Sequence, residues 1–528
     1  MHAHFVNVIA LIACVGLLVQ WAAWRFRIPA IVLLTIAGFV VGPATGLVDP
    51  SRDFGVLLEP FVQLAVAVIL FEGGLNLRFH ELRQAGGGVR RLISMGLILS
   101  FGLGALAAHY IGQLSWPVAI EFGAIIVVTG PTVILPLLRQ ARLRARTASL
   151  LKWEGIVNDP VGALLAVVVF EYFVLGGGTS AGYELAAVVI LTVVFAGALG
   201  WYTGQMLGAA YRRGLVPEYL KGPGMLAAVR GSYALGNLML EEAGLLTVTA
   251  LGIALGNANL PSIDELRRFK EYMTIALVSG LFIVLTADLD PALLAELDWR
   301  GAALIAALIF AVRPLAVFLA TIRTDLDWQE RVLLGWIAPR GIVAAAVAAT
   351  FSTRMFEAGY ADASKLLPLV FALIVTTVVL HGFSIGWLAR HLNLASRRSD
   401  GLIIVGASPW SIDLAGKLIE IEVPALVVDA SWHRLRPARL AGVNNHFGQI
   451  VSESADEILD ISSMGYVLAA TDNDAYNALV CTRFSSEFNR NAVFQIPMPT
   501  ADEDEKKGIT ATLRGQRAFS DNALYEDL

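Results

Sequence analysis

The sequence has little charge and almost no cysteine. Aspartate, glutamate, lysine and arginine make up only 16% of its 528 residues, while hydrophobic residues make up 56%. This balance excludes a chain made only of the two or three soluble domains that its length would suggest. The two cysteines, Cys14 and Cys481, are far apart, so we expect neither a disulfide framework nor a thiolate metal site.

Long apolar runs take the place of charge over most of the chain. They are about twenty residues long and recur from Phe5 to about Ala389, which is the length that crosses a hydrocarbon core of roughly 30 Å. The first run, 5–24, has neither the basic flank nor the small-residue cleavage pattern of a signal peptide, so we expect a retained helix. After Arg397 the sequence turns to mixed polar and apolar residues. The predicted domains are a transmembrane domain at 1–395, a soluble domain at 400–500 and a charged tail at 501–528.

About thirteen transmembrane helices account for these runs. The basic residues support this count, because cytoplasmic loops carry an excess of lysine and arginine. The loops that follow odd-numbered helices, with the start of the tail, hold or adjoin 22 basic residues, and the other loops hold 4. This alternation predicts an N-terminus outside the cell and a C-terminus in the cytoplasm. The predicted helix cores are 5–22, 28–47, 55–75, 92–112, 117–138, 149–174, 184–207, 224–240, 244–259, 272–287, 301–321, 331–351 and 366–389.

Helix breakers interrupt two of these helices at mid-membrane depth. Thr129-Gly130-Pro131-Thr132 lies in the fifth helix, and Pro339-Arg340-Gly341 lies in the twelfth. Freed backbone groups need a cavity or an ion to satisfy them, so broken helices in both halves of a membrane protein indicate a transporter site. Ordinary proline kinks are the alternative. We therefore predict an α-helical polytopic membrane protein with inverted repeats and broken crossing helices.

Three polar side chains stand within the apolar span of the sixth helix. They are Glu154, Asn158 and Asp159. A carboxylate at the centre of a bilayer costs roughly 2.5–3.5 kcal/mol on insertion scales, so it usually faces an ion path or a partner. Glu154 and Asn158 share a helix face, whereas Asp159 is turned by about 100° from Asn158. A structural hydrogen bond to a neighbouring helix is the alternative role for Asp159.

Arg340, within the second break, can serve as the counter-charge of one of these carboxylates. We expect it to pair with Glu154 and to leave Asp159 free to bind and release protons, because a permanent ion pair would hold Asp159 ionised. An arginine that faces an aqueous cavity without a fixed partner is the alternative.

Other ionisable residues within the predicted helices are weaker signals. Glu121 and Glu171 stand near helix ends, so we expect their side chains to reach the membrane boundary. His381 is expected at the interface as well, with pH sensing as the alternative role. Arg313 is expected to brace contacts between helices.

Six motifs, in order along the membrane unit, carry a family resemblance. They are Phe-Glu-Gly-Gly-Leu-Asn-Leu at 71–77, Thr-Gly-Pro-Thr at 129–132, the stretch 154–160, Glu-Ala-Gly-Leu-Leu at 242–246, Arg-Pro at 313–314 and Trp-Ile-Ala-Pro-Arg-Gly at 336–341. With these motifs the chain resembles the NhaP-type sodium/proton antiporters of the cation:proton antiporter superfamily, in the electroneutral branch marked by Asn-Asp.

The resemblance implies a role for each residue of the predicted site. Asp159 would be the carboxylate that binds either a proton or a monovalent cation, with Asn158 as its neighbour. Thr129 would supply a cation ligand through its hydroxyl or its backbone, and Glu72 would line the route to the site.

The resemblance also implies a bracing pair of Glu154 with Arg340, and a homodimer. One position departs from the family, which usually has a serine one turn below the aspartate, where this sequence has Gly155. We expect a water or the exposed backbone to take the place of that hydroxyl. The choice of cation among Na⁺, K⁺ and Li⁺ therefore stays open, with Na⁺ expected first.

A single carboxylate that holds either a proton or a cation couples the two fluxes by competition. If the site faces one side at a time and moves only when it is occupied, exchange is obligatory. Asn158 adds no charge, so the exchange of one cation for one proton leaves the site neutral in both states. We therefore expect electroneutral exchange.

Beyond Arg397, strand-like segments alternate with helical ones. This alternation predicts a parallel sheet of Rossmann type. The segment resembles the TrkA-N or RCK domains that regulate potassium transporters. The predicted strands are 401–406, 424–429, 466–470 and 492–496.

The loop after the first of these strands has lost part of a dinucleotide fingerprint. Where three glycines are expected, the sequence has Gly406, Ser408 and Ser411, with Pro409 between them. Asp429 stands about where a ribose-binding acid belongs. Two predictions stay open: the domain binds a nucleotide effector such as NAD(H), AMP or ATP, or it serves dimerisation or gating alone.

The alternatives to sodium/proton exchange in a bacterial plasma membrane differ in how well they explain these residues. A potassium/proton antiporter, or a potassium efflux system of the glutathione-gated type, would share both the scaffold and the tail. An ion channel would leave Asp159 unexplained, because a channel needs no obligatory proton site. A membrane-bound NAD enzyme is disfavoured, since no redox centre, flavin motif or catalytic Cys/His set appears. We expect no enzymatic activity and no nucleic-acid partner; the partners are the cation, the proton and the lipid bilayer.

Overall fold

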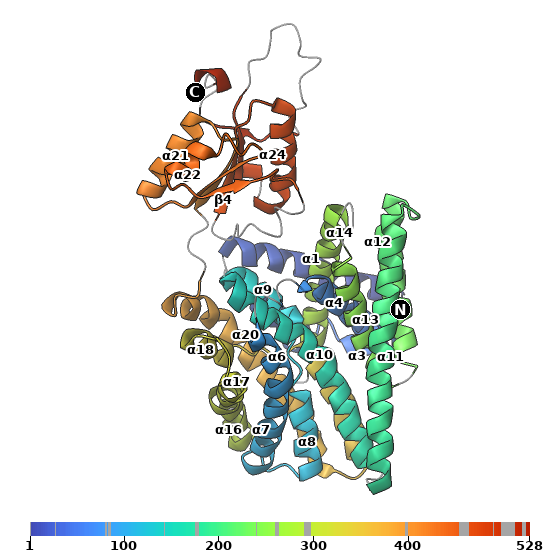
Figure 1. The fold of residues 1–528 in the computed structure, drawn as a ribbon. Helices are drawn as coiled ribbons and strands as arrows, with labels where there is room; N and C mark the ends of the chain where they lie inside the picture. Colours follow the sequence, from blue (N-terminus) through green and yellow to red (C-terminus); the bar gives the residue numbers. More distant parts are fainter. Residues whose placement is uncertain are drawn as a thin grey trace. The chain divides into compact units, whose positions relative to one another are not determined.

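The chain forms two compact units, residues 1–395 and 396–528 (Figure 1). The first unit is helical, and the second is built around a β-sheet. The computed structural model describes residues 2–26, 28–79, 82, 86–141, 143–174, 179–238, 240–258, 263–289, 297–395, 400–452, 464–488, 490–497, 513–519 and 524–528.

The first unit is a bundle of apolar helices. Seven helices among the described residues are long and apolar enough to cross a membrane, and shorter apolar helices accompany them. Helical residues occur at every predicted core. The count of thirteen spans and the inverted repeats stay predictions. The helices are α1 (His2–Phe26), α2 (Ala30–Phe39), α3 (Pro50–Phe54), α4 (Leu58–Leu75), α6 (Gly87–Arg91), α7 (Leu97–Tyr110), α8 (Trp116–Ile125), α9 (Pro131–Ala141), α10 (Ala145–Val174), α11 (Thr179–Arg212), α12 (Glu218–Gly236), α13 (Ala243–Gly256), α14 (Ile263–Ala287), α16 (Trp299–Ala307), α17 (Arg313–Thr321), α18 (Trp328–Trp336), α19 (Ile342–Glu357) and α20 (Leu366–His391).

Wider turns of the π type join some of these segments. They are η1 (Val40–Ala44) after α2, η3 (Leu92–Gly96) before α7 and η4 (Leu308–Val312) before α17. Pro43 lies inside η1 and Pro314 follows η4. A proline has no backbone N–H to donate to the preceding turn, and a π turn changes the hydrogen-bond spacing where that bond is missing.

Two helices are broken where the sequence predicts breaks. The first separates α8 from α9 at residues 126–130, and the second separates α18 from α19 at residues 337–341. The two breaks also touch each other. A Cβ atom added to Gly341 would lie 2.4 Å from Gly130 Cα, which is closer than a side-chain carbon can approach. Glycine at these positions therefore permits the two chain segments to cross in backbone contact.

Helix α10 packs beside this crossing. It contacts α8, α9 and α19. A Cβ added to Gly162 would lie 2.9 Å from the backbone nitrogen of Val128, so α10 has no side chain to separate it from the first break. The buried apolar residues of these helices belong to one continuous core.

The second unit contains a parallel six-stranded sheet of order β3-β2-β1-β4-β5-β6. The four predicted strands are present, and the shorter β3 and β6 were not predicted. The strands are β1 (Gly401–Val405), β2 (Ala425–Asp429), β3 (Asn445–Phe447), β4 (Met464–Ala469), β5 (Val493–Gln495) and β6 (Gln516–Arg517).

Helices and apolar residues cover both faces of this sheet. Each face has its own buried cluster, and inward residues of β1 alternate between the clusters, with Ile404 on one face and Ile403 on the other. The helices are α21 (Pro409–Glu420), α22 (Arg436–Leu440) and α24 (Asp474–Phe488). Most of the predicted charged tail, residues 501–512 and 520–523, lies outside the described residues, but β6 within 501–528 pairs with β5 and belongs to the sheet.

A substitution at the crossing tests how closely the two breaks approach. Gly341→Ala places a methyl group against Gly130 Cα, so we expect overpacking that costs about 1–3 kcal/mol and lowers the midpoint of thermal unfolding. The matched control is Gly197→Ala in α11, where an added Cβ would meet no atom within 4 Å. Equal midpoints for the two variants, measured in detergent, would contradict the crossing contact.

Candidate functional site

Asp159 lies midway along α10 and is completely buried, with 0% of its surface exposed. Neither carboxylate oxygen has a hydrogen-bond partner among the described residues. A carboxylate removed from water without a partner is energetically unfavourable unless it binds a proton or a cation. The position is therefore suited to reversible binding of a small positive ion.

Two further polar side chains are buried near the same turn of α10. Asn158 precedes the carboxylate, and Thr129 lies in the first break, next to the Val128 backbone that contacts Gly162. The Oδ1 atom of Asn158 and the Oγ1 atom of Thr129 also lack partners in the described part of the chain. The site region thus offers carboxylate, amide and hydroxyl oxygens, which are the ligands that hard cations prefer.

Glu72 lies on α4 and is also buried, with 3% exposed. Its Oε1 atom accepts a long hydrogen bond of 3.5 Å from Asn76 Nδ2, one turn further along the helix. The next residue, Gly73, faces α10, because an added Cβ would lie 3.3 Å from Ile156 Cγ1. Helix α4 therefore contacts α10 at the residue after Glu72 and carries a buried carboxylate of its own.

Glu154 is paired with Arg313 and not with Arg340, which corrects the expected pair. Arg313 Nη1 and Nη2 donate to the two carboxylate oxygens of Glu154 at 2.5 and 2.8 Å. Both side chains are buried, with 6% of Arg313 and 3% of Glu154 exposed. Two parallel charge-assisted bonds hold this carboxylate in place.

Arg313 also satisfies the end of a broken helix, which is why it holds this position. Its guanidinium donates to the carbonyl oxygen of Leu334 at 2.9 and 3.2 Å and to that of Ile337 at 3.2 Å. These carbonyls lie at the end of α18, where the break leaves them without helical partners. One side chain, that of Arg313, thus pairs with a buried carboxylate and also donates to the free carbonyl oxygens of the break.

Arg340 is buried within the second break and makes no ion pair among the described residues. Its backbone N–H donates to Thr377 Oγ1 of α20 at 3.3 Å. The residue therefore fastens the break to α20 through the main chain.

Gly155, one turn below Asp159, faces an apolar neighbour. A Cβ at this position would lie 2.7 Å from Ile134 Cδ1 of α9. We expected a water or the exposed backbone to replace the missing hydroxyl, but the methyl end of Ile134 fills the space. Among the described residues, an apolar group therefore stands where the family has a hydroxyl.

Two residues expected at the membrane boundary lie in the interior instead. Glu121 is 0% exposed and His381 is 1% exposed, and neither side chain has a hydrogen-bond partner in the described residues. His381 packs edge-on against Trp336, with ring centroids 5.9 Å apart. For Glu121 the reason is that α8 is only ten residues long and leads into the first break, so neighbouring helices cover a position near its end.

The second unit brings its four predicted residues together at the carboxyl ends of β1 and β2. Asp429 Oδ2 accepts a hydrogen bond from the backbone N–H of Ala407 at 2.8 Å. Ser408 and Ser411 form a reciprocal cap at the start of α21. Gly406 precedes them with a φ of +115°.

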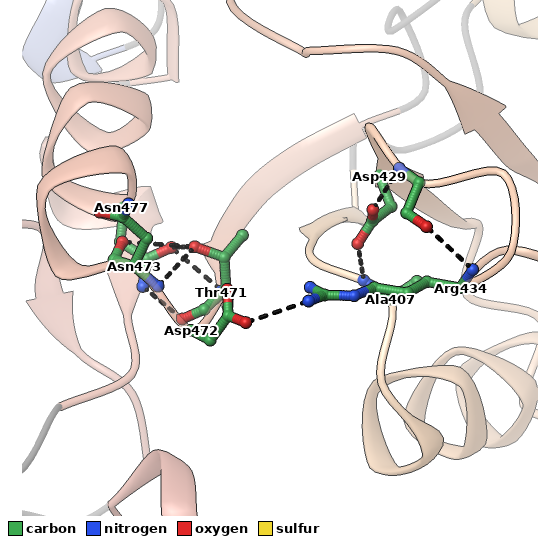
Figure 2. A network of polar contacts seen from close by, with 8 residues as sticks. Ala407, Asp429, Arg434, Thr471, Asp472, Asn473 and Asn477 are labelled. Atoms are coloured by element: carbon green, nitrogen blue, oxygen red, sulfur yellow. Dashed lines mark hydrogen bonds and ion pairs between the residues drawn. The ribbon is translucent and has the colours of Figure 1, made fainter.

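An ion pair spans the same edge of the sheet. Arg434, after β2, donates to Asp472, after β4, at 3.1 Å (Figure 2). The hydrogen bond to Asp472 raises the pKa of Arg434, so the guanidinium stays charged. The turn that carries Asp472 is fixed by the buried Asn477, whose Oδ1 accepts from the hydroxyl of Thr471 at 2.6 Å.

Comparison with known families divides the chain in the same way as its fold. The family model for the transmembrane sodium/hydrogen exchanger matches residues 9–391. The model for the TrkA-N domain matches residues 402–507.

Individual proteins give consistent matches. The K(+)/H(+) antiporter NhaP of Alkalimonas amylolytica is 26% identical over 400 residues, which are 75% of this chain and 67% of that protein. The Na(+)/H(+) antiporter 1 of Methanocaldococcus jannaschii is 24% identical over 367 residues, 67% of this chain and 84% of that protein. The chain thus spans about two thirds of the length of the potassium/proton relative.

A solved structure shares the fold of the membrane unit. The sodium proton antiporter MjNhaP1 from Methanocaldococcus jannaschii, at pH 8, superposes with a TM-score of 0.62 at 22% sequence identity. The match covers 74% of this chain and 99% of that chain.

The two buried arginines should differ in their effect on stability. Arg313→Met leaves Glu154 without a partner and frees the α18 carbonyls, so we expect a loss of about 3–5 kcal/mol and a lower midpoint of thermal unfolding. Arg340→Met, the matched control, breaks no ion pair and should cost less. A larger loss for Arg340→Met would contradict the observed pairing. Adding Glu154→Gln should recover part of the stability lost in Arg313→Met and none of that lost in Arg340→Met.

Proposed function

We propose that this chain, which belongs to the sodium/hydrogen exchanger family, exchanges a monovalent cation for a proton at the carboxylate of Asp159. The relatives are cation/proton antiporters of a multi-pass membrane family and not enzymes. The observation that carries the assignment is a fully buried Asp159 beside the first break, with neither oxygen bonded to a described residue.

Competition at one carboxylate accounts for coupled exchange. Asp159 with a bound proton is neutral, and Asp159 with a bound monovalent cation is neutral as well. An empty, ionised carboxylate in an apolar bundle is unfavourable, so the unoccupied site resists movement between the two sides of the membrane. One ion therefore crosses in each direction for every cycle, and the exchange is electroneutral.

The residues around Asp159 divide into ligands and supports. Thr129 and Asn158 supply oxygens to a bound cation, and Glu72 lines its route along α4. Glu154 braces the site through Arg313, because their bidentate pair ties α10 to α17 and α18. Arg340 braces the second break through its backbone bond to α20.

For the cation we propose K⁺ in place of the Na⁺ expected first from the sequence. The apolar end of Ile134 occupies the level below Asp159, so the site offers one oxygen fewer there. A smaller ion holds its hydration water more tightly, so the loss of an oxygen ligand disfavours Na⁺ more than K⁺. A potassium/proton antiporter is also among the relatives.

The setting in the cell follows from the distribution of basic residues. We propose a bacterial plasma membrane, with the N-terminus outside and the sheet unit in the cytoplasm. Pairing of two chains stays an expectation from the family resemblance.

Removal of the charge at position 159 tests the exchange site. Asp159→Asn cannot bind a proton or compensate a cation, so we expect exchange in proteoliposomes to fall to background. The assay is the dissipation of a preset pH gradient by added Na⁺, K⁺ or Li⁺, one at a time. Asp413→Asn, which changes an exposed carboxylate of the second unit, is the control.

Exchange at the wild-type rate by folded Asp159→Asn protein would refute the assignment. In the same vesicles, an imposed membrane potential should leave the wild-type rate unchanged, since the exchange moves no net charge. A rate that follows the potential would rule out one-for-one exchange while leaving Asp159 as the site.

Cation preference can be tested at Gly155. The double variant Gly155→Ser/Ile134→Ala makes room for a hydroxyl one turn below Asp159, and we expect affinity for Na⁺ relative to K⁺ to rise roughly two- to ten-fold. Ile134→Ala alone is the matched control, because it opens the space without adding an oxygen. The readout is the half-maximal concentration of each cation in the proteoliposome assay. An equal ratio in both variants would show that this level does not contribute to cation choice.

A further inference from the structure

The second unit has the fold of a nucleotide-binding domain, so its phosphate-binding loop can be examined directly. In a dinucleotide site, the pyrophosphate accepts hydrogen bonds from backbone N–H groups of the loop after β1 and of the first turn of the following helix. Here that loop spans residues 406–411 and leads into α21.

The donors of this loop are used by the chain itself. The Gly406 N–H donates to the Val428 carbonyl at 2.9 Å, and the Ala407 N–H donates to the Asp429 carboxylate at 2.8 Å. The Ser408 N–H donates to the hydroxyl of its capping partner at 2.8 Å. These three successive N–H groups are therefore not available to a phosphate.

The first turn of α21 also has few free backbone N–H groups. Pro409 stands at its first position and has no N–H. The Ser411 N–H donates to the hydroxyl of Ser408 at 3.3 Å, which completes the reciprocal cap. A helix N-terminus attracts anions through its free N–H groups, and this one has few to offer.

The remaining glycine of the fingerprint has a structural explanation. Gly406 has a φ of +115°, a conformation that side-chain-bearing residues rarely adopt. A Cβ at this position would also lie 2.4 Å from the carbonyl oxygen of Ala470, after β4. The glycine is thus required by close packing between the ends of β1 and β4.

Both carboxylate oxygens of Asp429, the candidate ribose ligand, already accept hydrogen bonds from the chain itself. Its Oδ2 atom accepts from Ala407, and its Oδ1 atom accepts from the N–H of Ser431 at 2.6 Å (Figure 2). The side chain is buried, and its negative charge lies against the loop that would have to accept a phosphate. Arg434 and Asp472 further join the two loops that border the end of β1.

We propose that this loop binds no nucleotide and that the Asp429 carboxylate serves as its resident anion. The domain keeps the β-α-β frame of its family, but its control of exchange does not depend on NAD(H), AMP or ATP at this position. Of the two roles left open for the domain, this supports gating or assembly without a nucleotide.

Titration of the full-length protein in detergent tests the proposal. Isothermal titration with NAD⁺, NADH, AMP and ATP, each up to millimolar concentration, should give no saturable heat at this loop. If saturable heat appears, the same titration is repeated with Ser408→Asp, which keeps a good helix cap but adds a negative charge where a phosphate would bind. Heat that disappears in this variant overturns the proposal, whereas heat that persists comes from another site and leaves it intact.

A restored loop provides the complementary test. Ser408→Gly/Pro409→Ala removes the capping hydroxyl and returns an N–H to the first turn of α21. We expect this variant to gain saturable binding of NAD⁺ or NADH in the concentration range where the wild-type protein shows none. Its folding is checked by wild-type exchange activity and an unchanged thermal midpoint. A folded variant that shows no saturable binding of NAD⁺ or NADH would contradict the role given to Ser408 and Pro409.

Discussion

The membrane unit depends on how it compensates charge that is removed from water. Helix α10 carries two buried carboxylates five positions apart, and their surroundings differ. Glu154 has both oxygens bonded to one guanidinium, which holds it in place. Asp159 is equally buried but has no partner among the residues that the structure describes. Since a lone buried carboxylate is unfavourable by several kcal/mol, Asp159 is the one of these two that would gain from binding an ion that later leaves.

Arg313, the partner of Glu154, also contacts one of the broken helices. A helix that ends inside an apolar bundle exposes carbonyl oxygens that lipid cannot satisfy. By donating to two such carbonyls and to Glu154, Arg313 stabilises the break and a charge with a single buried group. The irregular backbone of the second break is thereby supported by one buried side chain.

Much of the fold could be predicted because it depends on local sequence. The breakers at 129–132 and 339–341 end helices by their own chemistry, and alternating strand and helix patterns predict the parallel sheet of the second unit. The partner of Glu154 could not be predicted in this way. Arg313 and Arg340 are both buried arginines, and the choice between them depends on how helices more than 150 positions apart pack. The exchange roles of Asp159, Asn158, Thr129 and Glu72 stay predictions.

The fit of Ile134 against Gly155 and the bonds of Asp429 to its own loop likewise arise only in three dimensions. The contact between Gly130 and Gly341 has a mechanical consequence. With no side chain between them, the two crossing segments cannot slide past each other without separating backbones that already touch. A rearrangement that keeps this contact carries the chain on both sides of the two breaks together.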